Sequence, residues 1–189
     1  MEEEVKKFII SLAKKAIETY VKSGRILTKP KEYPSVLNEK RGVFVSIYKK
    51  DGDKTFLRGC IGLPYPSKPL IEGLIEASIS STMDPRFQPL TREELKNIFI
   101  EVSILSNPEK IEGRDYKEKI EKIQPFKHGV IIKRGLKSAL FLPQVWDDFP
   151  KKETFLSKLC VKAGLQPDEW MKNDTEFYIF EAEVIEEKL

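Results

Sequence analysis

The chain has very little cysteine or histidine, and these shortages exclude whole classes of protein. It has two cysteines, Cys60 and Cys160, and one histidine, His128, among its 189 residues. Two cysteines are too few for the disulfide framework of a small secreted domain, although one bridge between them stays open at this stage. A single histidine without a Cys-x-x-Cys pair does not form a recognisable zinc site. We therefore expect reduced thiols, no metal and no cofactor.

Long hydrophobic runs are also missing. No stretch approaches the roughly 20 continuous apolar residues that a membrane-spanning helix needs. The N-terminus, Met1–Glu4, is acidic where a signal peptide would be basic. The sequence therefore predicts a cytoplasmic protein with no membrane segment.

Neither sign of charge dominates. There are 33 basic and 30 acidic residues, for a net charge of +3, and the two signs are interleaved along the chain. This balance argues against a dedicated nucleic-acid binder. Glutamine and asparagine occur only four times each beside abundant lysine and glutamate. That composition is typical of ion-pair networks that work at high temperature, so we predict a thermophilic source.

The first part of the chain alternates helix and strand signals. Apolar residues from Val5 to Tyr20 recur at helical spacing, and the predicted helix ends at Gly24. Two β-prone runs, 42–48 and 54–63, flank an Asp-Gly pair within residues 50–53 and predict a hairpin.

The middle of the chain predicts a second helix, capped by Ser67 and ending before Asp84-Pro85. Thr91–Glu94 has the form of a capping box, in which the threonine and glutamate side chains satisfy free backbone N–H groups. Residues 98–105 are apolar on both faces and predict a central strand.

The remaining elements complete an α+β fold. Residues 129–133 and 138–142 predict paired strands, a helix stops at Gly164, and 176–185 predicts one closing strand. We expect a mainly antiparallel sheet packed with helices, in two lobes with a cleft between them. The larger predicted lobe is 1–107 plus 175–189, and the smaller is 108–174.

The segment Leu57–Gly62 (LRGCIG) is the most unusual stretch, because glycines at 59 and 62 weaken a strand unless something approaches its backbone closely. Strand alternation places Arg58 and Cys60 on one face, where the guanidinium would favour the thiolate of a nucleophile. The alternative is a buried, inert Cys60, with Gly59 and Gly62 accommodating a helix that crosses the strand.

Two further loops carry candidate ligand-binding residues. Arg86 offers a planar fork for an anionic group, unless Asp84 and Arg86 simply satisfy each other within the turn. Gln144 offers an amide donor, unless it only closes a turn. His128 would serve Cys60 as an acid or base if the fold joins them, but a hydrogen-bonded loop histidine is the simpler interpretation. Cys160 lies on an apolar helical stripe and is predicted to be core.

The LRGCIG hexapeptide resembles the hallmark of the AMMECR family, named for the Alport syndrome, midface hypoplasia and elliptocytosis chromosomal region. Similar stretches follow in the same order over nearly the whole chain: Asp84–Phe87, Pro89–Thr91, Glu101–Ser103, Leu142–Val145, Lys162–Leu165 and Trp170.

The resemblance implies an archaeal or bacterial family member with a two-lobed α+β fold, whose hexapeptide lines the cleft, and no established reaction. It supports Cys60, Arg58, Asp84, Arg86 and Gln144 as site residues. It does not support His128 as an obligatory base, because the family accepts residues such as aspartate there. It also suggests a Memo-like protein and a radical-SAM protein as partners.

These observations give three functional hypotheses. The first is an enzyme acting on a small molecule or biomolecule, with the Cys60 thiolate as nucleophile and Arg58 or Arg86 holding an anion. The alternative is a non-catalytic protein-interaction module that uses the same residues as a groove. The third, RNA or DNA binding through surface lysines, predicts steep salt dependence.

Overall fold

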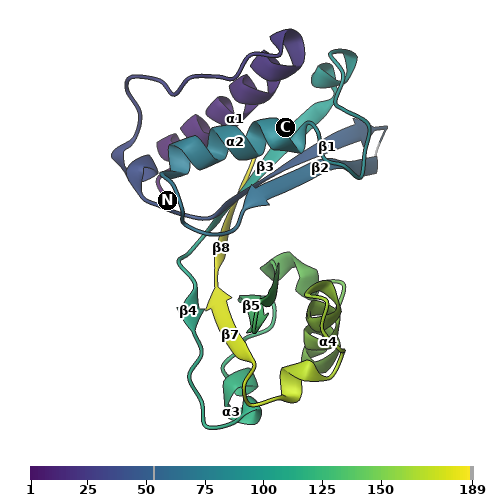
Figure 1. Ribbon diagram of the computed structural model, residues 1–189. Coiled ribbons are helices and arrows are strands. Elements are labelled where there is room, and N and C mark those ends of the chain that lie inside the picture. The colour runs from purple at the N-terminus through teal and green to yellow at the C-terminus, as the bar shows by residue number, and fades with distance from the viewer. Residues whose placement is uncertain (53, 188–189) are drawn as a thin grey trace. The chain divides into compact units, whose positions relative to one another are not determined.

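The computed structural model describes residues 1–52 and 54–187 (Figure 1). The helices are α1 (Glu3–Ser23), α2 (Leu70–Ser81), α3 (Tyr116–Glu121) and α4 (Lys152–Lys162). The strands are β1 (Val43–Asp51), β2 (Lys54–Leu63), β3 (Ile98–Leu105), β4 (Glu109–Lys110), β5 (Gly129–Arg134), β6 (Lys137–Phe141), β7 (Glu176–Phe180) and β8 (Ala182–Glu186). Short 3₁₀ helices lie at Ser35–Asn38, Glu93–Lys96, Pro143–Trp146 and Glu169–Met171. The predicted α+β class is confirmed.

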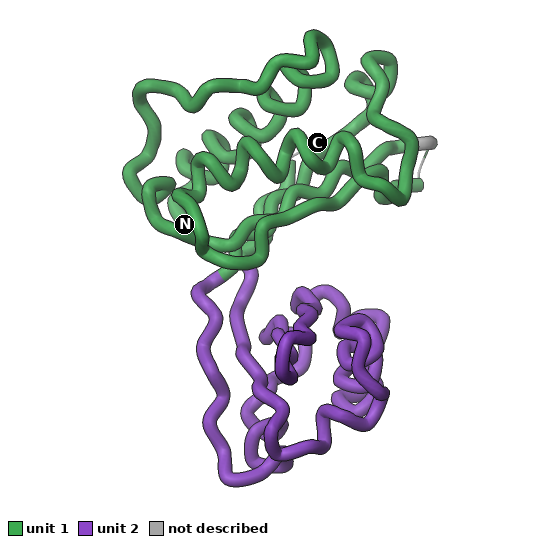
Figure 2. Tube along the Cα trace, in the orientation of Figure 1, with its two compact units in different colours: residues 1–105, 183–189 green, residues 106–182 purple. Residues whose placement is uncertain are grey.

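The chain divides into two compact units (Figure 2). Unit 1 is Met1–Leu105 together with the C-terminal segment that starts at Glu183, and unit 2 is Ser106–Ala182. The lobes expected from the sequence end at 107 and 174, whereas the units end at 105 and 182. Each unit has its own core of buried apolar side chains.

Unit 1 contains a sheet with the strand order β2-β1-β3-β8, in which β1 pairs antiparallel with both β2 and β3. Helices α1 and α2 lie side by side on one face of this sheet (Figure 1). Alternate residues of β1 and β3 point into that core: Val43, Val45, Ile47, Ile98, Ile100, Val102 and Ile104. We call the opposite face of the sheet the second face.

The first helix and the hairpin are confirmed. Helix α1 ends where Gly24 adopts a left-handed conformation (φ 69°) and donates its N–H to the carbonyl of Tyr20 at 2.7 Å. Strands β1 and β2 form the hairpin, with Asp51 paired to Lys54. Asp53 of the expected turn lies outside the described residues.

The second helix starts later than predicted. Pro69, in an extended conformation (φ −53°, ψ 140°), precedes Leu70, so Ser67 is too far away to cap the helix. The Leu70 N–H instead donates to the carbonyl of Glu39 at 2.8 Å. A side-chain cap is not needed where a neighbouring segment supplies a backbone acceptor.

Unit 2 contains an antiparallel sheet with the order β4-β7-β5-β6. The predicted hairpin of β5 and β6 and the helix before Gly164 are confirmed. Large aromatic side chains fill the core, and Trp146 stacks on Phe155 with ring centroids 3.6 Å apart.

The closing strand is two strands. The prediction of one strand over 176–185 is wrong because the chain leaves one sheet at Glu181 and enters the other. Glu181 exchanges hydrogen bonds with Ser106, which accepts from the Glu181 N–H at 2.9 Å and donates to its carbonyl at 2.8 Å. Strand β7 therefore belongs to the sheet of unit 2, and β8 to the sheet of unit 1.

Within residues 1–52 and 54–187, no helix combines the length and apolar character needed to cross a membrane.

Candidate functional site

A β-bulge in β2 decides which way the Cys60 side chain points. Lys54–Leu57 pair with Asp51–Tyr48, but Gly59 pairs with Ile47, so Arg58 is an extra residue without a partner in β1. Without the bulge, Cys60 would lie opposite Val45, whose side chain faces the core. With it, Cys60 lies opposite Ser46, on the second face.

The thiol of Cys60 is half-buried and contacts the hydroxyl of Ser46. The Ser46 hydroxyl donates to Cys60 Sγ at 3.2 Å. Ser46 itself is 7% exposed. Both cysteines are free thiols.

Asp84 and Arg86 hold the backbone of Cys60. Strand β2 is an edge strand, so its outer backbone groups have no neighbouring strand. The Cys60 N–H donates to Asp84 Oδ2 at 2.9 Å, and the Cys60 carbonyl accepts from Arg86 Nη2 at 3.4 Å. Asp84 and Arg86 therefore occupy the positions of the backbone partners that a further strand would supply.

The two members of this pair differ in exposure. The Asp84 side chain is 1% exposed and accepts from Arg86 Nη2 at 2.6 Å, whereas the Arg86 side chain is 57% exposed. The Arg86 guanidinium holds the pKa of Asp84 well below its usual range. The internal ion pair expected as the simpler interpretation is therefore present, and the guanidinium still reaches solvent.

Arg58 is paired with a glutamate that the sequence analysis did not connect to it. Its guanidinium donates to both carboxylate oxygens of Glu94, from Nε at 2.8 Å and from Nη2 at 3.0 Å. This ion pair lowers the pKa of Glu94 to about 2. Glu94 also accepts from the Thr91 N–H at 3.0 Å, which is one half of the predicted capping box. The guanidiniums of Arg58 and Arg86 both lie over the ring of Phe87.

The Cys60 thiol is not activated by Arg58. Burial raises the pKa of the thiol, and the nearby carboxylates of Asp84 and Glu101 add to the increase. The Ser46 hydrogen bond and the Arg86 guanidinium lower the pKa, but by less. The Arg58 guanidinium pairs with Glu94, and the charges that act on the Cys60 thiol are those of Arg86, Asp84 and Glu101, so the structure does not support the expectation that Arg58 favours the thiolate.

Both glycines of the hexapeptide have packing reasons. A Cβ on Gly59 would collide with the carbonyl oxygen of Ser81, the last residue of α2. A Cβ on Gly62 would collide with the Phe44 ring. The close approach of α2 at Gly59 agrees with the crossing helix considered as the alternative, and it fixes the strand on either side of Cys60.

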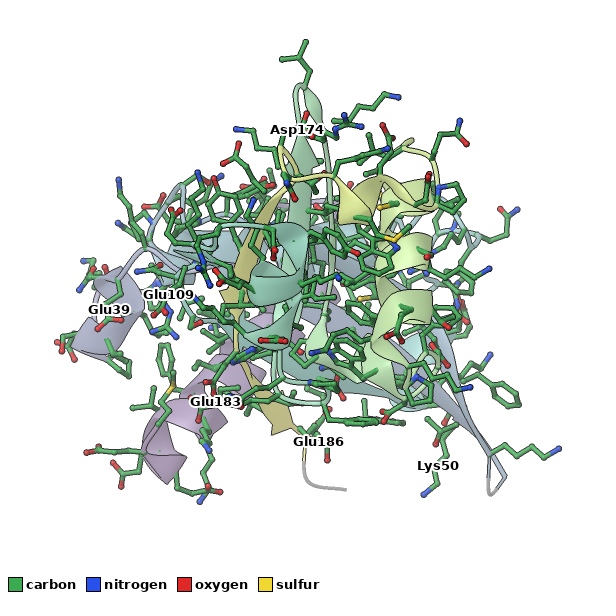
Figure 3. The ribbon with its side chains drawn as sticks, turned by 90° about the horizontal axis from the view of Figure 1, so that it is seen from below. Glu39, Lys50, Glu109, Asp174, Glu183 and Glu186 are labelled. Atoms are coloured by element: carbon green, nitrogen blue, oxygen red, sulfur yellow. The ribbon has the colours of Figure 1, made fainter. Side chains whose placement is uncertain are left out.

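The second face carries further titratable residues that sequence reasoning did not place there. Glu101 lies opposite Ser46, so Cys60, Ser46 and Glu101 form one row across β2, β1 and β3. Burial, and then the charge of Glu186, raises the pKa of Glu101; Figure 3 labels Glu186 near the end of β8. Tyr48, with a pKa raised mainly by burial, stacks on Phe99 with centroids 5.3 Å apart.

The other two candidate residues lie in unit 2. His128 is 7% exposed, and its Nδ1 accepts from the Gln124 N–H at 3.1 Å. Burial lowers its pKa. The His128 carbonyl accepts from Trp146 Nε1 at 2.7 Å, and exposed Gln144 lies in the same 3₁₀ helix as Trp146. His128 thus behaves as the hydrogen-bonded loop histidine of the simpler interpretation.

In the part of the chain that the structure describes, no group of three or more histidine, cysteine or acidic side chains has an arrangement that could hold a metal ion. The chemistry available at the row is that of a thiol, a hydroxyl, a carboxyl group and the nearby Arg86 guanidinium.

Comparison with known proteins agrees with the resemblance of the hexapeptide. Protein MK0488 of Methanopyrus kandleri is 48% identical over 190 residues, covering 96% of this chain and 87% of its own. Protein PYRAB00100 of Pyrococcus abyssi is 44% identical over 195 residues, covering all of this chain and 93% of its own. The crystal structure of PH0010 from Pyrococcus horikoshii matches with a TM-score of 0.89 and 43% identity, over 97% of this chain and 92% of that chain. The model of the AMMECR1 family matches residues 10–185, and the chain therefore belongs to this family.

Proposed function

We propose that the protein is an enzyme that acts on a small molecule or biomolecule at Cys60, on the second face of the sheet in unit 1. The observation that carries the proposal is the bulge at Arg58, which turns the thiol away from the core. Bulges occur frequently beside active sites, where they re-aim a side chain. A cysteine that served only packing would need neither the bulge nor the backbone contacts from Asp84 and Arg86.

In this proposal Cys60 is the nucleophile and Arg86 binds an anionic group of the substrate. Nε and Nη2 of Arg86 contact Asp84, and the exposed remainder of the guanidinium has a planar edge for a carboxylate or phosphate. Arg58, Gly59 and Gly62 position the strand. The sulfur forms a bond to an electrophilic carbon, and the leaving group departs with the bonding pair and takes up the thiol proton.

Burial raises the pKa of the Cys60 thiol in the free protein, so the proposed reaction includes removal of the thiol proton. Gln144 and His128 stay predictions, since the proposal uses residues of unit 1 alone.

Two alkylating reagents test this proposal directly. Iodoacetamide is neutral and iodoacetate carries a carboxylate, so the ratio of their rates at Cys60 measures anion recognition beside the thiol. We expect the iodoacetate-to-iodoacetamide ratio to be higher in the folded protein than in the unfolded chain. Arg86→Gln should lower that ratio, and Arg25→Gln, which removes an exposed arginine near the end of α1, should not. If Cys60 reacts with neither reagent in the folded protein, the enzyme proposal fails.

A non-catalytic interaction module is the second candidate. It is favoured by the pairing of both arginines with carboxylates, Arg58 with Glu94 and Arg86 with Asp84, and by the raised pKa of the Cys60 thiol. The Memo-like and radical-SAM proteins implied by the family resemblance are the partners to test. Co-purification of neither protein with the tagged, co-expressed chain would count against this candidate.

RNA or DNA binding is the least supported candidate, because basic and acidic residues are nearly equal in number. Absence of binding at low salt would dispose of it.

A further inference from the structure

Ser46 occupies a position where a hydroxyl is costly. It lies in β1, between β2 and β3 in the sheet, and is 7% exposed. A buried hydroxyl without a hydrogen bond is destabilising, and β-branched apolar residues suit such a strand better. Its presence therefore needs an explanation from its contacts.

The hydroxyl hydrogen-bonds with the Tyr48 side chain, and it also contacts the sulfur of Cys60. Ser46 and Cys60 are direct cross-strand partners, and the hydroxyl donates to Cys60 Sγ at 3.2 Å. A donor pointed at sulfur favours the negatively charged form over the neutral one, because hydrogen bonds to ionised acceptors are stronger. The bulge at Arg58 creates this pairing, since without it Gly59 would face Ser46.

We propose that Ser46 is a positioning residue for Cys60, whose hydroxyl holds the thiol on the second face and stabilises the sulfur when it loses its proton. This inference rests on the proposed function, in which Cys60 is the reacting group. It adds a residue outside the LRGCIG segment, on a different strand, to the machinery of the site.

Charged and titratable groups surround the pair on several elements. Tyr48 lies on β1, and Asp84 and Arg86 lie in the segment after α2. Glu101 on β3 completes the row, with Glu186 of β8 acting on Glu101. Among these neighbours, Arg86 acts in the same direction as Ser46, while Asp84 and Glu101 oppose both.

The test measures the titration of Cys60 without requiring the thiol to be accessible to a reagent. Cysteine labelled with ¹³C at Cβ gives one NMR signal for each of the two cysteines, and Cys160→Ala assigns them. The Cys60 signal is followed against pH in the unchanged protein and in Ser46→Ala, Ser46→Thr and Ser138→Ala. Ser138 lies in β6 and is exposed, so it serves as the matched serine control. Circular dichroism verifies that each variant is folded.

We expect Ser46→Ala to raise the midpoint of the Cys60 titration by about one pH unit, a size that one hydrogen bond to a charged group supplies. Ser46→Thr keeps the hydroxyl, so its midpoint should lie close to that of the unchanged protein. Ser138→Ala should leave the midpoint unchanged. An unchanged midpoint in Ser46→Ala would overturn the inference, as would an equal shift in Ser138→Ala. These outcomes are independent of the alkylation test, so a reactive Cys60 with an unshifted Ser46→Ala midpoint leaves the proposed function standing while removing Ser46 from it.

Discussion

The two cysteines of this chain differ in burial, and the contrast distinguishes a core residue from one that reaches the surface. Cys160 lies in α4, is 0% exposed and belongs to the apolar core of unit 2. Cys60 lies on an edge strand, is half-buried, and is held by side chains from other segments. Burial raises the pKa of both thiols, that of Cys160 to about 11. The difference is therefore in access and in tethering, and not in the direction of the pKa shift.

The largest expected difference is in alkylation rate. Cys60 should react with iodoacetamide at alkaline pH at least about 100-fold faster than Cys160, because a fully buried thiol reacts only when its surroundings open. The rate at Cys60 should rise with pH to a midpoint above the ordinary cysteine value, since the pKa is raised. Peptide mass spectrometry measures both sites in one sample. Comparable rates at the two sites would remove the contrast.

Loss of the Asp84 carboxylate is the next largest effect. Asp84→Asn should lower the free energy of unfolding by about 3 kcal/mol, because it weakens the contacts of a 1% exposed side chain with the Cys60 N–H and with Arg86. Urea unfolding measures the loss. Glu72→Gln is the matched control, since the Glu72 carboxylate contacts Lys29 in an exposed pair.

The Asp84 carboxylate also makes the stability of the protein depend on pH in the acid range. A carboxyl group whose folded pKa is depressed contributes stability above its unfolded pKa, near 4, and this contribution is lost as the pH falls toward the folded value. Asp84→Asn should therefore be less sensitive than the unchanged protein to acid below about pH 4. Equal acid sensitivity in the two proteins would contradict this account of Asp84.

Replacement of each cysteine by serine should have unequal costs. Cys160→Ser places a hydroxyl in an apolar core and should lower the free energy of unfolding by about 2 kcal/mol. Cys60→Ser should cost less than about 0.5 kcal/mol, because its side chain is half-buried beside a hydroxyl. Thermal and urea unfolding of the two variants provide the comparison, and equal costs would show that Cys60 is also a core residue.

The smallest effects are on the Cys60 pKa itself. Glu101→Gln should lower this pKa and Arg86→Gln should raise it, each by less than about one pH unit, because each removes one nearby charge. The pH profile of alkylation at Cys60 measures both shifts. Cys160 is the internal control, since the charges that act on its pKa are those of Glu169, Asp168 and Arg134. Shifts of the same sign in the two variants would rule out a charge effect.

Local patterns in the sequence predicted most of the fold. The helix before Gly24, both hairpins and the central strand at 98–105 follow from periodicity and turn chemistry. The closing strand was predicted as one element because residues on either side of Glu181 have the same β-prone composition. Which sheet each half joins depends on distant partners, such as Ser106, that no local pattern encodes.

The site shows the same limit more sharply. Simple counting from the pair Asp51 and Lys54 places Gly59 opposite Ser46, and only the bulge at Arg58 brings Cys60 there. Strand alternation therefore gave a wrong environment for Arg58 and gave no reason to consider Ser46. The Glu94 partner was visible as a capping residue, but its contact with Arg58 spans 36 positions. Contacts of that range come from tertiary packing.

The path of the chain through the two units also sets an order for folding. Unit 2 is one continuous segment, Ser106–Ala182, whereas the sheet of unit 1 is completed only by β8 at the far end of the sequence. During synthesis, the whole of unit 2 leaves the ribosome before β8 can pair with β3. That pairing closes a loop of nearly 80 residues, and the entropy cost of closing a loop grows with its length. Until then β3 has one unpaired edge, on which another chain can pair. Early folding of unit 2 shortens the effective loop and so helps β8 to cover this edge, which protects the nascent chain from pairing with other chains.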